Sequence, residues 1–189
     1  MQKFDTNGNY LLQLGSKGAS DGQLNSPYGI TVHSDKVYIA DFSNKRISVF
    51  QTNGKFCISF GSDQLGGPFD VTVSANNHLI IADCSNSCVW TFTLDGHYVG
   101  KFGTPGSCRG QLIVPFSLTT DLNGFIIVAD TGNHRVSIFD KYGNCVHCFG
   151  SNGSAYGQFS YPYGIALSPN GSIYVSDAFN TRIQIFSSY

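Results

Sequence analysis

The chain has 189 residues, 11 Lys and Arg, 12 Asp and Glu, and a formal net charge of −1. This length suffices for one compact domain with a buried core, and the near-neutral charge argues against attraction of nucleic acid over the whole surface. Plentiful glycine (22) and aromatic residues (14%) with few charged ones (12%) indicate a folded, turn-rich β protein.

The first fifteen residues predict the end of one strand followed by a second, complete strand over residues 9–15. The basis is an alignment of QKFDTNGNYLLQLGS with SVFQTNGKFCISFGS further along the chain. No basic start followed by an apolar stretch is visible in this region, and no apolar run of about 18 residues occurs anywhere. We therefore expect a cytoplasmic protein that makes no contact with membranes.

Four similar segments follow, beginning at Pro27, Pro68, Pro115 and Pro162 and spaced by 41, 47 and 47 residues. Each predicts a short first strand, a turn, a second strand ending in Asp, a tight turn, and a third strand with alternating large residues such as RISVF. A glycine-containing turn then leads to a fourth strand such as FCISFG. The last segment ends after its third strand, at RIQIFSSY.

Four-stranded antiparallel units repeated along a chain are typical of a propeller. We predict an all-β fold: a β-propeller of four four-stranded antiparallel blades that forms a single domain over residues 1–189. In this prediction the amino-terminal strand at residues 9–15 completes the last blade and closes the ring, which removes an exposed sheet edge. A closed ring predicts a monomer, whereas an open arc predicts an edge-to-edge homo-oligomer.

The repeated pattern, Gly-Gln then Pro-aromatic-Gly-Ile and later Ala-Asp-x-x-Asn-x-Arg, resembles the NHL repeat. The run from Asp130 to Val136 is most similar to its core. The chain as a whole is similar to the carboxy-terminal propellers of tripartite-motif (TRIM-NHL) ubiquitin ligases and their relatives, which usually have six blades. This resemblance implies a module that binds protein or RNA, as the substrate-recognition part of a ubiquitin ligase whose catalytic parts lie outside these residues.

Strand order predicts where a ligand would bind. The start of the first strand and the end of the second lie at the same end of an antiparallel pair, so the Pro-aromatic segments and the Asp turns share one face, here called the Pro-aromatic face. The aromatic residues after proline should ring the mouth of the central channel: Tyr28, Phe69, Phe116 and Tyr163. Residues that differ between blades are the better candidates for specificity: Phe42, Lys45, His134 and Phe179.

Arg46, Arg135 and Arg182 allow two interpretations. They could bind a ligand beside the aromatic rings, since aromatic side chains stack on bases or peptide groups and guanidinium groups make bidentate or cation–π contacts. Alternatively, each follows an Asp by five residues across a tight turn and could hold that turn. The second segment has Cys88 where the others have Arg. A protein or peptide is the leading ligand, and single-stranded RNA on the same face is the alternative.

Catalytic patterns are weak. Some related propellers are lyases or hydrolases with a channel metal, but the five His residues fall at different places in the repeat, so we expect no enzyme activity, no metal and no cofactor. Cys145, His147 and Cys148 hint at a metal site, yet strand alternation predicts that the two cysteines face opposite ways. The six cysteines are expected to be reduced thiols, and Cys84 and Cys88 would pair only in an exported protein.

Overall fold

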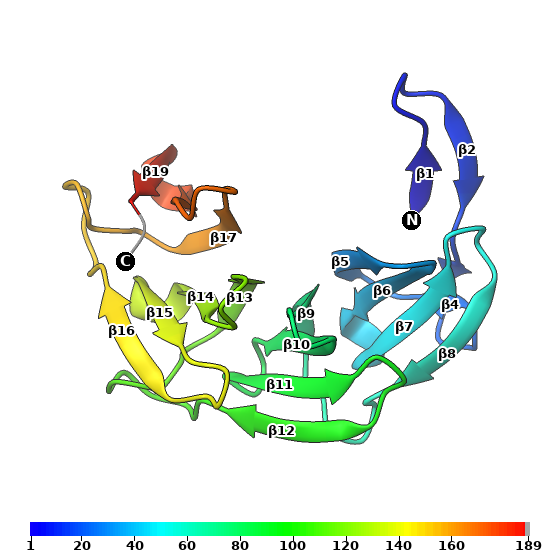
Figure 1. The fold of residues 1–189 in the computed structure, drawn as a ribbon, viewed down its shortest axis with the longest axis horizontal. Coiled ribbons are helices and arrows are strands. Elements are labelled where there is room, and N and C mark those ends of the chain that lie inside the picture. Colours follow the sequence, from blue (N-terminus) through cyan, green and yellow to red (C-terminus); the bar gives the residue numbers. More distant parts are fainter. Residues whose placement is uncertain (188–189) are drawn as a thin grey trace.

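The computed structural model describes residues 1–187, which form β-strands and three short 3-10 helices (Figure 1). Within these residues, no helix is long and apolar enough to cross a membrane. The segment before the first blade holds two short strand pairs, one antiparallel and one parallel: β1 (Gln2–Phe4) with β2 (Tyr10–Gln13), and β3 (Ser16–Lys17) with β4 (Gln23–Leu24).

Four blades follow, and they confirm the predicted all-β, four-blade propeller. Each blade begins its first strand at one of the four predicted prolines. The first two blades are β5 (Pro27–His33), β6 (Lys36–Asp41), β7 (Arg46–Gln51) and β8 (Phe56–Phe60), then β9 (Pro68–Val73), β10 (His78–Asp83), β11 (Cys88–Thr93) and β12 (Tyr98–Phe102). The last two are β13 (Pro115–Thr120), β14 (Ile126–Asp130), β15 (Arg135–Phe139) and β16 (Cys145–Phe149), then β17 (Pro162–Leu167), β18 (Ile173–Asp177) and β19 (Arg182–Phe186).

The core lies between the blades. Alternating residues of a strand point to opposite faces of its sheet, so each blade presents one apolar row to the preceding blade and another to the following one. Between the first two blades, for example, Tyr38, Ile47 and Val49 pack against Leu79 and Ile81. Similar clusters join the second blade to the third and the third to the fourth. The first strands β5, β9, β13 and β17 lie innermost along the arc (Figure 1).

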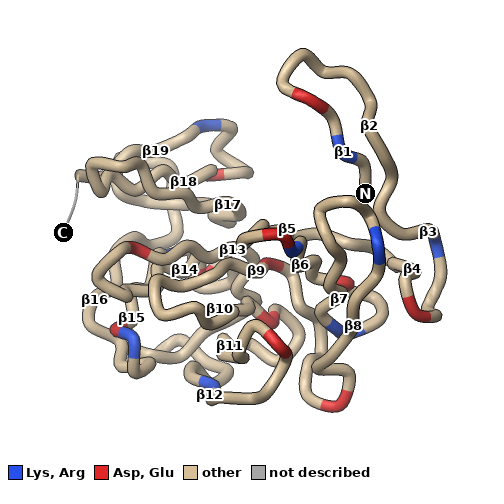
Figure 2. The backbone as a smooth tube through the Cα atoms, turned by 45° about the vertical axis from the view of Figure 1, so that its right-hand side comes forward, with Lys and Arg blue, Asp and Glu red and all other residues tan. Residues whose placement is uncertain are grey.

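The predicted closure of the ring is wrong. The last sheet has three strands, β17–β18–β19, and β2 pairs with β1 instead of β19. The hairpin of β1 and β2 lies apart from β19 in both backbone views, so the four blades form an open arc (Figures 1 and 2).

Local contacts explain why the hairpin of β1 and β2 forms. Asp5 accepts hydrogen bonds from the backbone N–H groups of Asn7 and Asn9 at 2.9 and 2.8 Å, which fixes the turn. The amino group of Met1 donates to the carbonyl of Leu14 at 3.1 Å. A short hairpin needs little loop closure, whereas pairing β2 with β19 would require the sheets to curve enough to bring the chain ends together.

Candidate functional site

A polar clasp closes the Pro-aromatic face of the first blade. Asp41 is fully buried and pairs with the Nε of Arg46 at 3.0 Å, while Asn44 donates to the same carboxylate at 2.8 Å. The guanidinium of Arg46 also donates to the carbonyl oxygens of Ser20 and Gln23 at 2.9 and 2.8 Å. The clasp therefore ties the tight turn after β6 to the loop that precedes β5.

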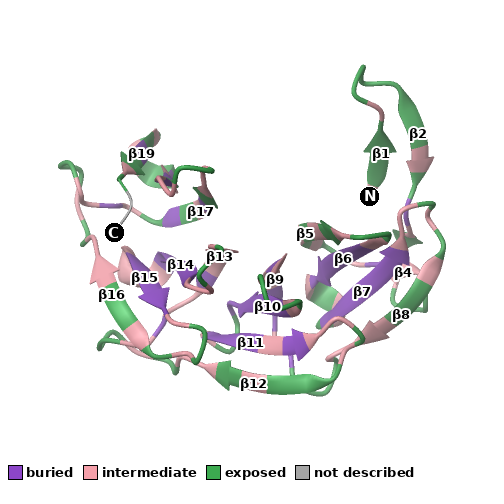
Figure 3. Cartoon of the chain, in the orientation of Figure 1, coloured by how far each residue is buried: buried purple, intermediate pink, exposed green. Residues whose placement is uncertain are grey.

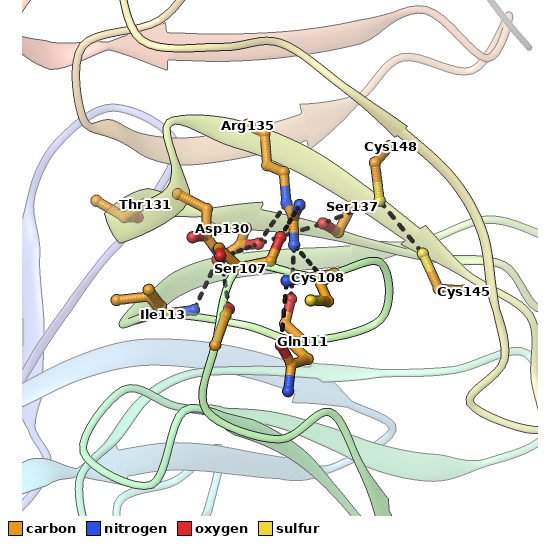
Figure 4. A network of polar contacts seen from close by, with 12 residues as sticks. Ser107, Cys108, Gln111, Ile113, Asp130, Thr131, Arg135, Ser137, Cys145 and Cys148 are labelled. Carbon is orange, nitrogen blue, oxygen red and sulfur yellow. Dashed lines mark hydrogen bonds and ion pairs between the residues drawn. The ribbon is translucent and has the colours of Figure 1, made fainter.

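The third and fourth blades repeat this clasp. Figure 4 shows Arg135 between Asp130, at 2.8 Å, and three loop carbonyls, those of Ser107, Cys108 and Gln111. In the fourth blade Arg182 pairs with Asp177 at 2.8 Å and donates to the corresponding loop. The guanidinium groups of all three predicted arginines thus donate their hydrogen bonds to partners within the chain.

The net pKa shift differs in direction between the carboxylates of the third and fourth clasps. Burial raises the pKa of Asp130, against hydrogen bonds from the backbone N–H of Ile113 and from the side chains of Asn133 and Arg135. At Asp177, burial acts in the same direction, but hydrogen bonds that include those from the backbone of Ser160 and from Arg182 together lower the pKa. The contrast follows from position, because the third blade is covered on both sides and the fourth on one.

The second blade replaces the arginine with other donors. Asp83 accepts from the backbone N–H groups of Gly66 and Gly67 at 2.8 and 2.9 Å and from the indole Nε1 of Trp90 at 3.1 Å. Cys88, at the arginine position, is buried, and burial raises the pKa of its thiol to about 12. The shorter loop of this blade brings its own backbone to the carboxylate, so no guanidinium is needed.

The four aromatic residues after proline form one continuous stack. Ring centroids are 4.2 Å apart between Tyr28 and Phe69, 4.3 Å between Phe69 and Phe116, and 4.7 Å between Phe116 and Tyr163. The edge of Phe42 packs on Tyr28 at 5.4 Å. The residues therefore lie on the inner strands, but in this open arc they pack against one another where the prediction had them ring the mouth of a channel, with Tyr28 and Tyr163 exposed at the two ends.

Beneath this stack lies a recess of about 410 Å³ with a carboxylate in its wall. Asp70 accepts hydrogen bonds from the hydroxyl of Ser117 at 2.8 Å and the backbone N–H of Leu118 at 3.1 Å, and burial raises its pKa. A Cβ at the neighbouring Gly29 would lie 2.5 Å from Asp70, so glycine is required there. Asp70 also departs from the repeat, where Gly29, Ser117 and Gly164 hold the equivalent positions.

A second aromatic cluster includes one residue that sequence reasoning missed. His134 accepts a hydrogen bond at Nδ1 from the backbone N–H of Tyr161 at 3.2 Å, and their rings are 4.6 Å apart. The exposed ring of Phe179 lies 4.9 Å from that of Tyr161. The signal was available: Tyr161 precedes a blade-starting proline, where the other blades have Ser26, Gly67 and Val114.

Positive charge on the Pro-aromatic face is sparse. Lys45 is exposed beside the first clasp, whereas Arg109 donates to the backbone carbonyls of Cys145 and Val146 on the outer strand β16. Figure 2 shows basic and acidic positions scattered along the chain without a basic stripe. The exposed character of this face is therefore mainly aromatic.

The opposite end of the blades holds a larger recess that sequence reasoning did not single out. Its volume is about 900 Å³, and it is lined by the end of β5 and by the turns that follow β9, β13 and β17, with His33, Ala75, Leu122 and Pro169 among the lining residues. Leu122 is almost fully exposed there. A leucine in the turn DLNG, where the other turns carry small or polar residues, was the available signal.

The predicted orientation of the cysteines on β16 is wrong. The Sγ atoms of Cys145 and Cys148 are 3.3 Å apart (Figure 4). Val146 is left out of the strand pairing, since Phe139 pairs with Cys145 and Ile138 with His147, and this bulge interrupts the alternation. Both thiols are free, and no cluster of three or more His, Cys, Asp or Glu suited to a metal occurs within residues 1–187.

Comparison with known proteins places these features in context. The family model described as NHL repeat matches residues 65–92, 117–139 and 159–186. Over 106 residues the chain is 30% identical to Protein brain tumor of Drosophila melanogaster, an alignment that covers 54% of this chain and 10% of that protein. It is 30% identical over 106 residues to mouse E3 ubiquitin-protein ligase TRIM32, covering 48% of this chain and 16% of the ligase.

A solved streptogramin B lyase shares the fold. It superimposes with a TM-score of 0.70 at 17% identity, over 92% of this chain and 57% of the lyase chain. The chain thus spans a small part of the two curated relatives and little more than half of this solved propeller. Identity this low carries information on the fold alone.

Proposed function

Because the chain is a β-propeller built from NHL repeats, we propose that it is a non-catalytic binding module for a protein or peptide partner on its Pro-aromatic face. The observation that carries this proposal is the exposed aromatic surface of that face. Tyr28 and Tyr163 expose the ends of the inner stack, and Phe179 and Tyr161 expose a second cluster. Aromatic side chains supply most of the binding energy in many protein interfaces because they bury large areas at low entropic cost.

Charge favours a peptide over single-stranded RNA. The three clasp arginines already donate to an Asp and to loop carbonyls within their own blades, so they are proposed as scaffold. Asp70 lies in the wall of the recess under the aromatic stack, where its ionised carboxylate would repel a phosphate and attract a basic side chain. We therefore propose a peptide with at least one Lys or Arg next to an apolar or aromatic residue.

The relatives suggest a setting for this binding. One is named as an E3 ubiquitin-protein ligase, so we propose that the propeller selects the partner of a ligase whose catalytic parts lie elsewhere. Six free thiols fit a reducing, cytoplasmic location. The similarity to a lyase concerns the fold alone, so lyase or hydrolase activity forms no part of the proposal.

Selection of phage-displayed random peptides on the immobilised chain tests the proposal. Selected peptides should be enriched in a basic residue adjacent to an aromatic or apolar one. Their affinity should fall about tenfold or more for Tyr28→Ala and for Phe179→Ala, as for truncation of an aromatic hot spot. Leu122→Ala, which removes an exposed side chain at the opposite end, is the matched control and should leave the affinity unchanged.

A fluorescent oligouridine provides the RNA arm of the same experiment. If the RNA binds with steep salt dependence and competes with no selected peptide, the ligand is RNA and the peptide proposal is wrong. Peptides whose binding falls for Leu122→Ala and not for the two aromatic variants would move the site to the opposite recess. Melting temperatures of all variants show whether a loss reflects the site or the fold.

A further inference from the structure

The two ends of the arc expose side chains that every internal blade buries. In the first blade, Ile47 and Val49 are 0% and 1% exposed because they pack against the second blade. Their counterparts in the last blade are Ile183 and Ile185, because these residues have equivalent partners on the second strand of the blade. Ile47 pairs with Ala40 as Ile183 pairs with Ser176, and Val49 pairs with Tyr38 as Ile185 pairs with Tyr174. Ile183 and Ile185 are 67% and 61% exposed.

The other end shows the complementary surface. Val71 of β9 is 2% exposed against the preceding blade, whereas its counterpart Ile30 of β5 is 47% exposed. The equivalent residues Leu118 and Ile165 are also buried. Figure 3 shows both patterns, with exposed positions on β19 and β5 and buried ones on the internal strands β6, β7, β10, β14 and β15.

The hairpin of β1 and β2 occupies part of this second surface. Its residues Leu12 and Leu14 join Leu24, Ile39 and Phe50 in one cluster on the first blade. The pairing of β1 with β2 follows that of β7 with β8, including a bulge before the phenylalanine: Phe4 pairs with Tyr10 as Phe50 pairs with Phe56. β2 is thus the fourth strand of a further blade, and β1 occupies the end of its third strand.

We propose that β17–β19 of one copy packs on the first blade of a second copy, so that β19 pairs with the second copy's β2. The three strands of one copy and β2 of the other together make a complete four-stranded blade. By the register of β7 with β8, Ile183 would lie opposite Leu14 and Ile185 opposite Leu12, with β1 displaced. The interface continues a packing that this chain already makes three times within itself.

Charge does not oppose this contact. Ile183 and Ile185 flank the neutral Gln184 on one copy, and Ile30 and Val32 lie on β5 of the other, so apolar side chains meet apolar ones. The interface is head-to-tail, because two different surfaces of the chain meet. An open assembly therefore keeps one free surface of each kind, one at each end, until a ring closes, and the assembly grows with concentration.

Light scattering of the purified chain, measured over a range of concentrations, tests the proposal. The mean mass of the wild type should rise with concentration. Ile185→Asp should abolish association through β19, and Ile30→Asp should abolish it through β5, so each variant alone should stay monomeric. Mixed together, the two variants should form a heterodimer and nothing larger, because one intact surface remains on each copy.

Tyr142→Asp, a charge placed on an exposed turn residue between β15 and β16 of the third blade, is the control and should associate as the wild type does. Ile183→Asp provides a second variant should Ile185→Asp lower the melting temperature. A wild-type chain that stays monomeric at every concentration would overturn the proposal and assign both surfaces to other occupants. Association that survives in each single variant, or mixed variants that do not combine, would also overturn it.

Discussion

Replacement of Arg46 by Met should destabilise the chain far more than loss of a surface charge would. Met keeps most of the apolar volume but removes the ion pair with Asp41 and the two hydrogen bonds to the carbonyls of Ser20 and Gln23. Asp41 is fully buried, so its carboxylate would remain away from water without its cation. Breaking one partner of a buried pair typically costs about 3–5 kcal/mol, against about 0–1 kcal/mol for an exposed pair.

Urea unfolding followed by circular dichroism measures this loss. With an m-value of about 2–3 kcal/mol/M for a chain of this size, the midpoint should fall by about 1–2 M. Lys45→Met, one residue away and exposed, is the matched control and should leave the midpoint in place. The double variant Asp41→Asn with Arg46→Met should lose less than the sum of the single losses, since the two residues act on each other.

A loss of less than about 1 kcal/mol for Arg46→Met would refute the structural interpretation of the clasp. The guanidinium would then be free to serve a ligand, as the alternative interpretation of the sequence holds.

Two further predictions concern the cysteines. Cys88→Arg, which restores the residue of the other blades, should lower stability, because Trp90 already donates to Asp83 and Cys88 lies in the core. A red shift in tryptophan emission together with a lower urea midpoint would show this loss. A raised midpoint would contradict it. Iodoacetamide at pH 8 should alkylate the exposed Cys57 and Cys108 within minutes and spare Cys88, since a thiol with a pKa of about 12 carries almost no thiolate at that pH. Peptide mass spectrometry locates the labels, and rapid labelling of Cys88 in the folded chain would show that it is not buried as described.

The blades could be predicted well from the sequence because the same strand and turn signals recur in all four repeats. Proline starts, Asp-ended second strands and glycine turns each recur, and the strands begin at Pro27, Pro68, Pro115 and Pro162 as expected. The pairing of the amino-terminal strand could not be predicted in the same way. The residues of β2 have the pattern of a fourth strand, which can pair with any third strand of the repeat. The curvature that decides whether β2 pairs with β1 or with β19 arises from packing between the sheets.

The candidate site was predicted in part for a similar reason. Alternation and strand order placed Tyr28 and Tyr163 on one face, and the resemblance between blades gave their neighbours. Tyr161 was missed because the residue before proline differs from blade to blade, so the repeat pattern does not mark it. The approach of Cys145 to Cys148 depends on a bulge at Val146, which no periodicity within the strand reveals.

The hydrophobic clusters that join each blade to the next give the arc a thermodynamic character of its own. Stability in such a chain is approximately a sum of terms for single blades and for interfaces between neighbours. The two middle blades have two such interfaces each, and the last blade has one. Opening should therefore begin at the last blade and proceed inward, so amide hydrogens of β18 should exchange faster than those of β10. The aromatic stack crosses all three interfaces, and a ligand that bridges it would link the free energies of blades that otherwise open one by one.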